Sequence, residues 1–311
     1  MPRSCCVDIL LATYNGANNL GSQIDSILEQ SHENFRLIIR DDSSSDCTLE
    51  IISNYNDSRI ILVQDGFGNV GVSENFKILL KHATSEYVMF SDQDDVWFPE
   101  KIAKMLSFIV NIDSGQIPCL AYSSGIVVDS KLQPFKNVKH TAYQPISSLE
   151  SGFFLNGGVQ GCAMIFNKKL YTSVLDQDFN WYLHDQAITL FALCFGRVYF
   201  YNEPLFYYRQ HSFNVVGFKK QSLLKTILKY LFEKEESFLV KSSVRDSVRS
   251  FYNTYGQSLS IEKRNSMQDY LSIENGKVVD FLYSCGKHGW DLNGSKIRLL
   301  VKALLCKRFV E

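Results

Sequence analysis

The sequence lacks the features that mark membrane-spanning, secreted and repetitive proteins. It has no run of eighteen consecutive apolar residues, which argues against a spanning helix. The opening MPRSCCVDILLATYNG has a short apolar stretch without a small-residue cleavage site, so no signal peptide is expected. The eight cysteines form no CxxC pair and lie mostly in apolar runs. We therefore expect reduced core thiols in a globular, cytoplasmic protein.

The net charge is also close to zero, because the 311 residues include 32 Lys and Arg and 33 Asp and Glu. The distribution is uneven. Residues 219–311 carry 17 basic and 10 acidic side chains, whereas residues 1–218 carry 15 and 23. The front of the chain is acidic and the tail is basic, and we expect no nucleic-acid partner.

What the sequence does contain is an alternation of apolar strands and amphipathic helices in its first hundred residues. Strands are expected at 7–15, 35–42, 59–64 and 86–90, with helices at 20–30, 47–56 and 73–84. This alternation predicts an α/β fold with a mostly parallel sheet covered by helices on both faces. Ligands bind such sheets at the carboxyl ends of the strands, where Asn15, Asp41, Asp42 and the run Asp92 to Asp95 fall.

Beyond residue 101 the alternation loosens. A helix is expected at 101–112 and a strand at 120–129, followed by the Gly-rich FFLNGGVQGCAMIFN and the aromatic GRVYFYNEPLFYYRQH. From about residue 219 the pattern is helical. We therefore expect two regions, an α/β domain over residues 1–218 and a C-terminal helical appendage over 219–311.

The stretch SDQDDVWFP, residues 91–99, places three carboxylates within four positions after a buried strand. Carboxylates this close repel one another unless a cation or hydrogen-bond donors neutralise them. Asp92 and Asp94 could hold Mn²⁺ or Mg²⁺, which prefer oxygen ligands and can in turn hold a diphosphate. A solvated turn capping the next helix would explain one aspartate but not three.

Residues 66–71, GFGNVG, match the GxGxxG pattern of dinucleotide-binding proteins. Taken alone, the match would suggest a nucleotide-dependent oxidoreductase. However, it lies in the third strand and helix unit instead of the first, and three carboxylates follow it where ribose recognition needs one. Glycines that make a turn before a helix are the simpler interpretation.

An ordered set of short motifs carries a resemblance to a known family. VDILLATYNG, RDDSSSDCT, NVGVSENF, SDQDDVW, HDQ and YYRQHSFNVVG, in that order, resemble the family 2 glycosyltransferases of GT-A fold, most closely their bacterial rhamnosyltransferase-like branch. The resemblance covers roughly residues 7–217 and implies inverting sugar transfer from a nucleotide-diphosphate sugar. A non-catalytic module that binds sugar nucleotides remains an alternative.

The resemblance also implies roles for residues at the strand ends. The metal would be held by Asp94 directly, with Asp92. The nucleotide-sugar would be bound by Thr13, Tyr14, Asn15, Asp41, Asp42, Asp92 and Gln93. A cation at the aspartates would neutralise the negative charge that develops on the leaving diphosphate.

Two later motifs would complete the site. HDQ matches the family's acidic position, although His184 stands where the family usually has Glu, and it implies Asp185 as the catalytic base. Asp185 could instead cap the helix that follows. In YYRQH, Arg209 would contact phosphate oxygens and His211 would complete the metal site.

The resemblance implies an enzyme that builds a bacterial surface polysaccharide, O-antigen or capsule, by moving a sugar from dTDP-L-rhamnose or a UDP-sugar to a lipid-linked glycan acceptor. The segment SKIRLLVKALLCKRF, residues 295–309, has an apolar helical stripe among basic residues. That layout suits either peripheral docking on the inner face of the cell membrane or packing on the protein's own domain.

Overall fold

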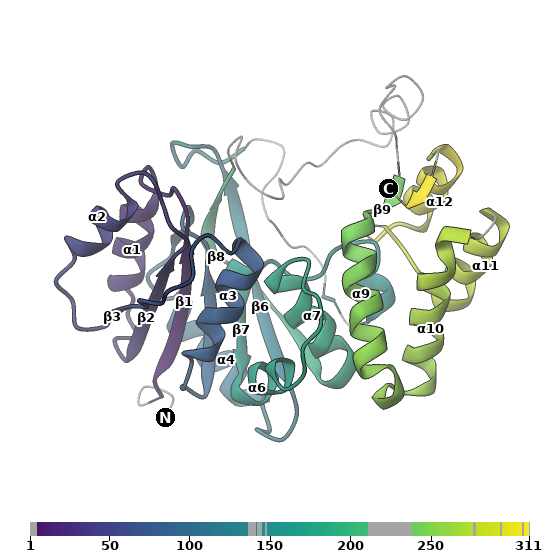
Figure 1. The fold of residues 1–311 in the computed structure, drawn as a ribbon, viewed down its shortest axis with the longest axis horizontal. Coiled ribbons are helices and arrows are strands. Elements are labelled where there is room, and N and C mark those ends of the chain that lie inside the picture. The colour runs from purple at the N-terminus through teal and green to yellow at the C-terminus, as the bar shows by residue number, and fades with distance from the viewer. Residues whose placement is uncertain are drawn as a thin grey trace.

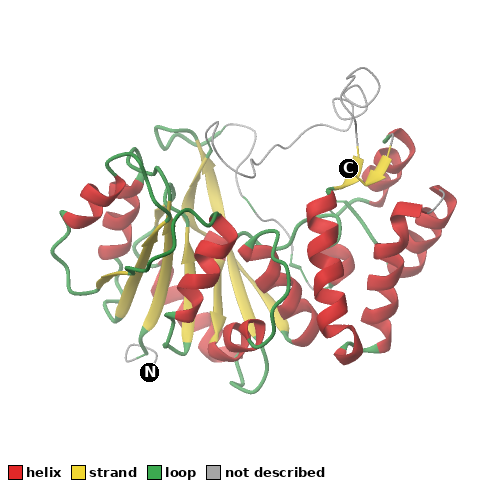
Figure 2. Cartoon of the chain, in the orientation of Figure 1, coloured by secondary structure: helices red, strands yellow, loops and turns green. Residues whose placement is uncertain are grey.

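The structure is a computed structural model that describes residues 5–135, 141, 145–146, 148–210, 238–275, 278–292, 294–306 and 308–310. A twisted sheet with helices on its two faces forms one end of the molecule, and a group of helices forms the other (Figures 1 and 2). In the described part of the chain, no helix is long and apolar enough to cross a membrane.

The large sheet has eight strands in the order β3-β2-β1-β4-β7-β6-β8-β5. Parallel pairing joins β1 to β2 and β4, β2 to β3, and β6 to β8, while the β4–β7, β6–β7 and β5–β8 pairs are antiparallel. Only β7 and β5 therefore run against the others, which confirms a mostly parallel sheet. The strands are β1 (Val7–Thr13), β2 (Phe35–Asp41), β3 (Ile60–Leu62), β4 (Tyr87–Ser91), β5 (Val96–Trp97), β6 (Cys119–Val128), β7 (Met164–Asn167) and β8 (Arg197–Arg209).

Helices cover both faces of this sheet, so the central strands are buried along almost their whole length and not at alternate positions. Every residue of β4 is buried, and in β1 only Ala12 is partly exposed. Figure 1 shows α3 in front of the sheet and α4 behind it. The helices of this part are α1 (Leu20–Leu28), α2 (Thr48–Ser53), α3 (Val72–Lys81), α4 (Lys101–Ile112), α5 (Leu149–Gly152), α6 (Lys168–Leu175) and α7 (His184–Phe195), with a 3₁₀ turn η2 (Gly161–Ala163).

The C-terminal helices are α9 (Ser242–Tyr255), α10 (Ile261–Leu271), α11 (Val278–His288) and α12 (Lys296–Leu305), with 3₁₀ turns η3 (Gly256–Ser258) and η4 (Ser272–Asn275) and a parallel strand pair β9 (Phe238–Val240) and β10 (Arg308–Val310). They confirm the expected helical tail. Aromatic contacts join them to α7 and to residues 153–154, such as Phe191 with Phe251 and Phe154 with Tyr270. The tail thus shares one apolar core with the sheet, and the expected boundary at 218 and 219 lies outside the described residues.

Candidate active site

Backbone and side chains from three strand ends meet at the carboxyl edge of the sheet. Gln93 lies in the loop of residues 92–95 that follows β4, here called the aspartate loop. Its Oε1 accepts from the Tyr14 N–H at 2.9 Å, and its Nε2 donates to the Tyr14 carbonyl at 3.0 Å. A Cβ on Gly16 would lie 2.3 Å from Gln93 Oε1, so any larger residue here would displace the Gln93 amide. Gln93 therefore ties the aspartate loop to the loop after β1.

The loop after β1 is tied equally closely to the loop after β2. The Thr13 hydroxyl donates to Asp41 Oδ1 at 2.8 Å, and Asp41 also accepts from the N–H and hydroxyl of Ser44. Asn15 has a left-handed backbone (φ 47°), which asparagine tolerates, and its Oδ1 accepts from the Ser45 N–H at 2.8 Å. The Tyr14 side chain is half-exposed at this edge. The structure thus brings these predicted donor-binding residues together.

Asp42 is buried, and its carboxylate accepts hydrogen bonds from the neighbouring loop of residues 66–71. Its carboxylate accepts from Arg40 Nη1 at 2.8 Å and from the N–H groups of Val70 and Gly71 at 2.9 and 2.8 Å. Those two N–H groups belong to GFGNVG, where a bound dinucleotide would need free donors for its phosphates. The glycine loop is therefore a turn organised around Asp42. A contact between Asp42 and a donor nucleotide stays a prediction.

The aspartate loop contains a dense cluster of acidic groups. One carboxylate oxygen each from Asp92 and Asp95, together with Cys162 Sγ of η2, lie within 4.8 Å of one another. Burial, with repulsion from Asp94 added, raises the pKa of Asp92 to about 7. Burial and the same repulsion raise the pKa of Asp95 well above its ordinary value. Ionising both carboxylates is therefore unfavourable, and a bound cation would stabilise their charged forms.

This donor set fits a hard divalent cation. Asp95 Oδ2 is buried, and none of the described residues donates a hydrogen bond to it. Carboxylate oxygens are preferred ligands of Mg²⁺ and Mn²⁺. Burial raises the pKa of the Cys162 thiol, so its sulfur is neutral and a poor ligand for such an ion. Of the predicted metal ligands, Asp92 is in this cluster, Asp94 acts on it through its charge, and His211 lies outside the described residues.

Lys101, at the start of α4, is buried beside the aspartates, which no local sequence pattern indicated. Its Nζ donates to the Cys162 carbonyl and lies 3.8 Å from the Trp97 ring centroid and 4.3 Å from that of Phe206. Burial lowers the pKa of Lys101 to about 7, while its charge lowers the pKa of both Asp92 and Asp95. This lysine thus links the aspartate loop to η2 and partly offsets the acidic charge.

Asp185 lies in the first turn of α7, where its negative charge raises the pKa of Asp92. Its Oδ1 accepts from the Gln186 N–H at 2.7 Å, and a bond from the Gly161 N–H also favours the ionised form. Burial outweighs these bonds and raises the pKa of Asp185 to about 6. The N-cap of α7 is Leu183 and not Asp185, so the alternative in which Asp185 caps this helix is wrong.

His184 packs in the core. Its ring stacks on Phe76 with centroids 3.6 Å apart and meets Phe90 edge-on at 4.9 Å. Burial lowers the pKa of His184 to about 3, so the ring is neutral at physiological pH. A Cβ on Gly161 would lie 2.6 Å from His184 Nε2, so glycine lets η2 approach α7 closely.

Arg209, at the end of β8, donates hydrogen bonds to the aspartate loop. Its Nε donates to the Asp94 carbonyl at 2.9 Å, its Nη1 donates to the Ser130 carbonyl, and its backbone N–H donates to Asp95 Oδ1 at 3.4 Å. The side chain is almost fully buried. These contacts hold the loop in shape, and a contact with donor phosphate stays a prediction.

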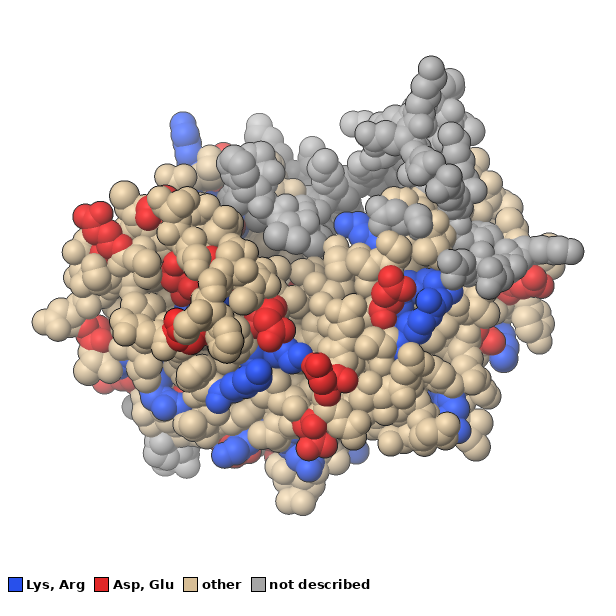
Figure 3. All heavy atoms as spheres, viewed as in Figure 1, with Lys and Arg blue, Asp and Glu red and all other residues tan. Residues whose placement is uncertain are grey.

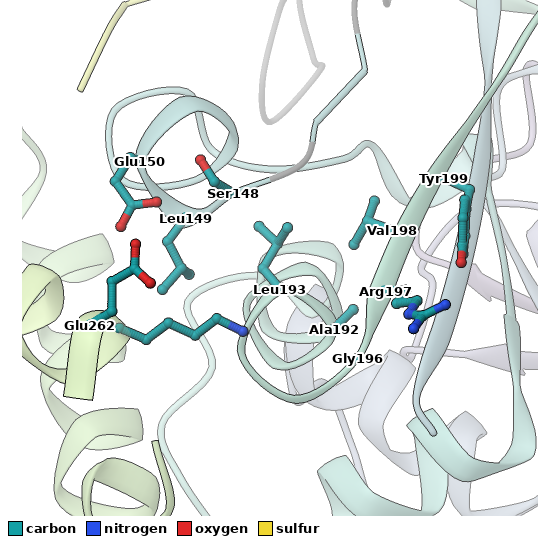
Figure 4. A pocket seen from close by; sticks show the side chains of 11 residues that line it. Ser148, Leu149, Glu150, Ala192, Leu193, Gly196, Arg197, Val198, Tyr199 and Glu262 are labelled. Carbon is teal, nitrogen blue, oxygen red and sulfur yellow. The ribbon is translucent and has the colours of Figure 1, made fainter. Parts of the chain in front are cut away.

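A cavity of about 310 Å³ lies at the opposite end of α7 from Asp185 (Figure 4). Its charged lining comes from Glu150, Arg197, Glu262 and Lys263, and Lys263 Nζ donates to the Cys194 carbonyl at 2.8 Å. Lys263 therefore satisfies a carbonyl at the end of α7. The aspartates do not line this cavity, so it is separate from the candidate site.

The comparison with protein families gives one match. The model of glycosyl transferase family 2 matches residues 8–175, which span β1 to α6 and include the whole aspartate loop. That is more than half of the chain.

Several curated relatives are glycosyltransferases. An uncharacterized glycosyltransferase of Rickettsia prowazekii is 25% identical over 311 residues and covers 94% of each chain. The dTDP-rhamnosyl transferase RfbG of Shigella flexneri is 29% identical over 223 residues, 67% of this chain and 73% of its own. The UDP-Glc:alpha-D-GlcNAc-diphosphoundecaprenol beta-1,3-glucosyltransferase WfaP of Escherichia coli is 36% identical over 103 residues, 33% of this chain and 41% of its own.

Solved structures share the fold at low identity. TarS of S. aureus in complex with UDP-GlcNAc has a TM-score of 0.55 at 17% identity and covers 91% of this chain and 88% of its own. The mannosyltransferase PcManGT of Pyrobaculum calidifontis, in complex with GDP-Man and Mn²⁺, has a TM-score of 0.54 at 14% identity, with 90% and 73% covered. The fold is that of the GT-A glycosyltransferases, and the chain belongs to glycosyl transferase family 2.

Proposed function

We propose that this glycosyltransferase transfers a sugar with inversion from a nucleotide-diphosphate donor to a glycan acceptor, with Asp185 as the base. The observation that carries the proposal is the placement of Asp185. Its carboxylate, with a pKa raised to about 6, lies close enough to the aspartate cluster for its charge to raise the pKa of Asp92. A base near neutrality beside a cation-binding cluster is what single displacement at an anomeric carbon needs.

The chain's residues divide between the two sides of the reacting carbon. On the leaving-group side, Asp92 and Asp94 would hold Mn²⁺ or Mg²⁺, which when bound supplies positive charge for the departing diphosphate. Thr13, Tyr14 and Asn15 would line the nucleotide. On the opposite side, the Asp185 carboxylate accepts the proton of the attacking acceptor hydroxyl as the new glycosidic bond forms and the diphosphate leaves.

The donor and the acceptor are proposed from the names of similar proteins. We propose dTDP-L-rhamnose as the first donor to test because RfbG, which covers two thirds of this chain, is named a dTDP-rhamnosyl transferase. UDP-glucose is the second, because WfaP is named for it. The name of WfaP also includes a diphosphoundecaprenol, and a polyprenol-linked glycan is therefore the proposed acceptor, used at the cytoplasmic face of the cell membrane in O-antigen or capsule synthesis.

The test begins with binding. A panel of dTDP-rhamnose, UDP-glucose, UDP-galactose, UDP-GlcNAc and NADH is scanned by thermal shift with Mn²⁺ and with EDTA. One sugar nucleotide should raise the melting temperature, and only with the metal, because a ligand that binds the native state alone stabilises it. A shift with NADH that ignores EDTA would favour an oxidoreductase. Donor binding without sugar transfer to any acceptor fraction would favour a non-catalytic module.

A further inference from the structure

Helix α12 presents an apolar face to solvent. Ile297 is 66% exposed, Leu300 42% and Leu304 60%, and the spacing of these positions by three and four residues puts them on one side of the helix. The helix packs on the protein through other residues, since Leu299 and Ala303 are buried at 2% and 1%. Of the apolar stripe seen in the sequence, Ile297, Leu300 and Leu304 therefore face solvent, whereas Val301 and Leu305 are partly buried.

The neighbouring helix α11 adds to this exposure. Val279 and Tyr283, one turn apart, are 73% and 72% exposed. Of the thirteen large apolar side chains that are exposed in the described residues, five lie between residues 279 and 304. Scattered exposed apolar residues need no explanation, whereas a concentration of them on two adjacent helices calls for one.

Basic residues accompany the apolar face. Lys296 is exposed and Arg298 partly so, at the start of α12. Lys302, in contrast, donates from its Nζ to the Leu239 carbonyl at 3.2 Å and does not add to this face. Elsewhere the charges are mixed, and the face in Figure 3 shows acidic and basic side chains interspersed over the sheet domain. An exposed apolar helical face with basic residues beside it complements an anionic lipid surface.

The position of α12 in the fold suits such a surface. The parallel strands β1 and β2 rise from the end of the molecule where the N-terminus lies, and α12 lies at the other end, toward their carboxyl ends (Figure 1). The candidate site opens at those carboxyl ends. Helix α12 therefore lies toward the same end of the molecule as the reacting groups.

We propose that the exposed face of α12, formed by Ile297, Leu300 and Leu304 with Lys296 and Arg298, docks this enzyme on the anionic surface of a lipid bilayer. The proposal rests on the proposed function in one respect, since a polyprenol-linked acceptor gives docking its use. The apolar side chains enter the boundary between headgroups and acyl chains, and the basic side chains contact lipid phosphates.

The experiment is vesicle co-sedimentation of the full chain with phosphatidylcholine vesicles that contain, or lack, phosphatidylglycerol. Binding should require phosphatidylglycerol and weaken as salt is raised. The variant Ile297→Gln/Leu300→Gln/Leu304→Gln should lose most of the bound fraction, about tenfold or more in partition coefficient. The matched control is Leu49→Gln/Ile61→Gln/Val110→Gln, which changes three exposed apolar residues on α2, β3 and α4 and should bind as the wild type does.

Two further measurements keep the outcomes separate. Donor-induced thermal shift should be equal in wild type and the α12 variant, because α12 carries none of the donor-binding residues, so loss of that shift in both would refute the proposed function but not the docking. Equal vesicle binding by the α12 variant and wild type would refute the docking. A lower mass of the variant in sedimentation equilibrium, with vesicle binding unchanged, would assign the face to a second copy of the chain.

Discussion

The substitution Asp185→Asn separates the two roles that this residue could have. Asparagine has nearly the same shape and keeps a carbonyl oxygen that can accept from the Gln186 N–H. It cannot take a proton from an acceptor hydroxyl. If Asp185 is the base, turnover should fall by about 10² or more while donor binding is retained.

The magnitude of the pH effect follows from burial. A folded-state pKa of about 6 means that at pH 5 about one tenth of Asp185 is ionised, and at pH 7 about nine tenths. The base is active when ionised, so wild-type turnover should rise about tenfold between pH 5 and pH 7 and then level off. In Asp185→Asn this rise should vanish.

Stability gives an independent readout. Because burial raises the folded-state pKa of Asp185 above its unfolded value, the native state binds the proton more tightly. The carboxyl group therefore contributes stability at low pH that is lost as the pH rises through the ordinary aspartate value toward about 6. At pH 7 the asparagine variant should be no less stable than wild type, and more stable by at most about 3 kcal/mol.

The assay is sugar transfer followed by nucleotide release across pH 5 to 8, with urea unfolding of both proteins at pH 7. Near-normal turnover in Asp185→Asn would refute the assignment of the base. A variant that unfolds more readily at pH 7 and keeps its turnover per folded molecule would show that the carboxylate stabilises the first turn of α7 instead.

Three other substitutions test how the site is held together. Lys101→Met removes the donor to the Cys162 carbonyl, and urea unfolding should show a loss of about 1–3 kcal/mol; no loss would mean that this bond does not stabilise the site. Gly16→Ala places a Cβ 2.3 Å from Gln93 Oε1 and should weaken donor binding. Adding Gln93→Ala should relieve this clash and restore binding. Donor binding by the double variant that is no stronger than by Gly16→Ala alone would contradict this reasoning. Asp94→Ala should abolish transfer but leave the melting temperature within a few degrees, because Asp94 is a partly exposed loop residue.

The sequence predicted the sheet domain well because its signals are local. Buried strands such as VDILLAT and amphipathic helices such as KIAKMLSFIVNI carry their period within a few residues, and α4 begins and ends where its pattern indicated. The antiparallel strand β7 was not predicted. It lies in a Gly-rich stretch, and its direction depends on pairing with β4 and β6, which are distant in sequence.

The sequence predicted that the candidate residues gather at one edge of the sheet, but not the contacts that they make there. The carboxylates follow strands directly, and parallel strands bring their ends to one edge. The buried position of Lys101 and the nearness of Cys162 come from η2 folding against the aspartate loop, and no local pattern reports such a contact. The outward direction of the α12 stripe was likewise undecided, because amphipathicity specifies a face but not the neighbour it meets.

The most direct test of the account is single-turnover transfer from the donor found by thermal shift to a polyprenol-linked acceptor, measured in Mn²⁺, in excess EDTA, and after Mn²⁺ is restored. We expect inverted product with Mn²⁺, none in EDTA, and recovery when the metal returns, since the cluster that contains Asp92 and Asp95 fits a divalent cation. Undiminished transfer in EDTA, or a product with retained anomeric configuration, would contradict a metal-dependent inverting glycosyltransferase.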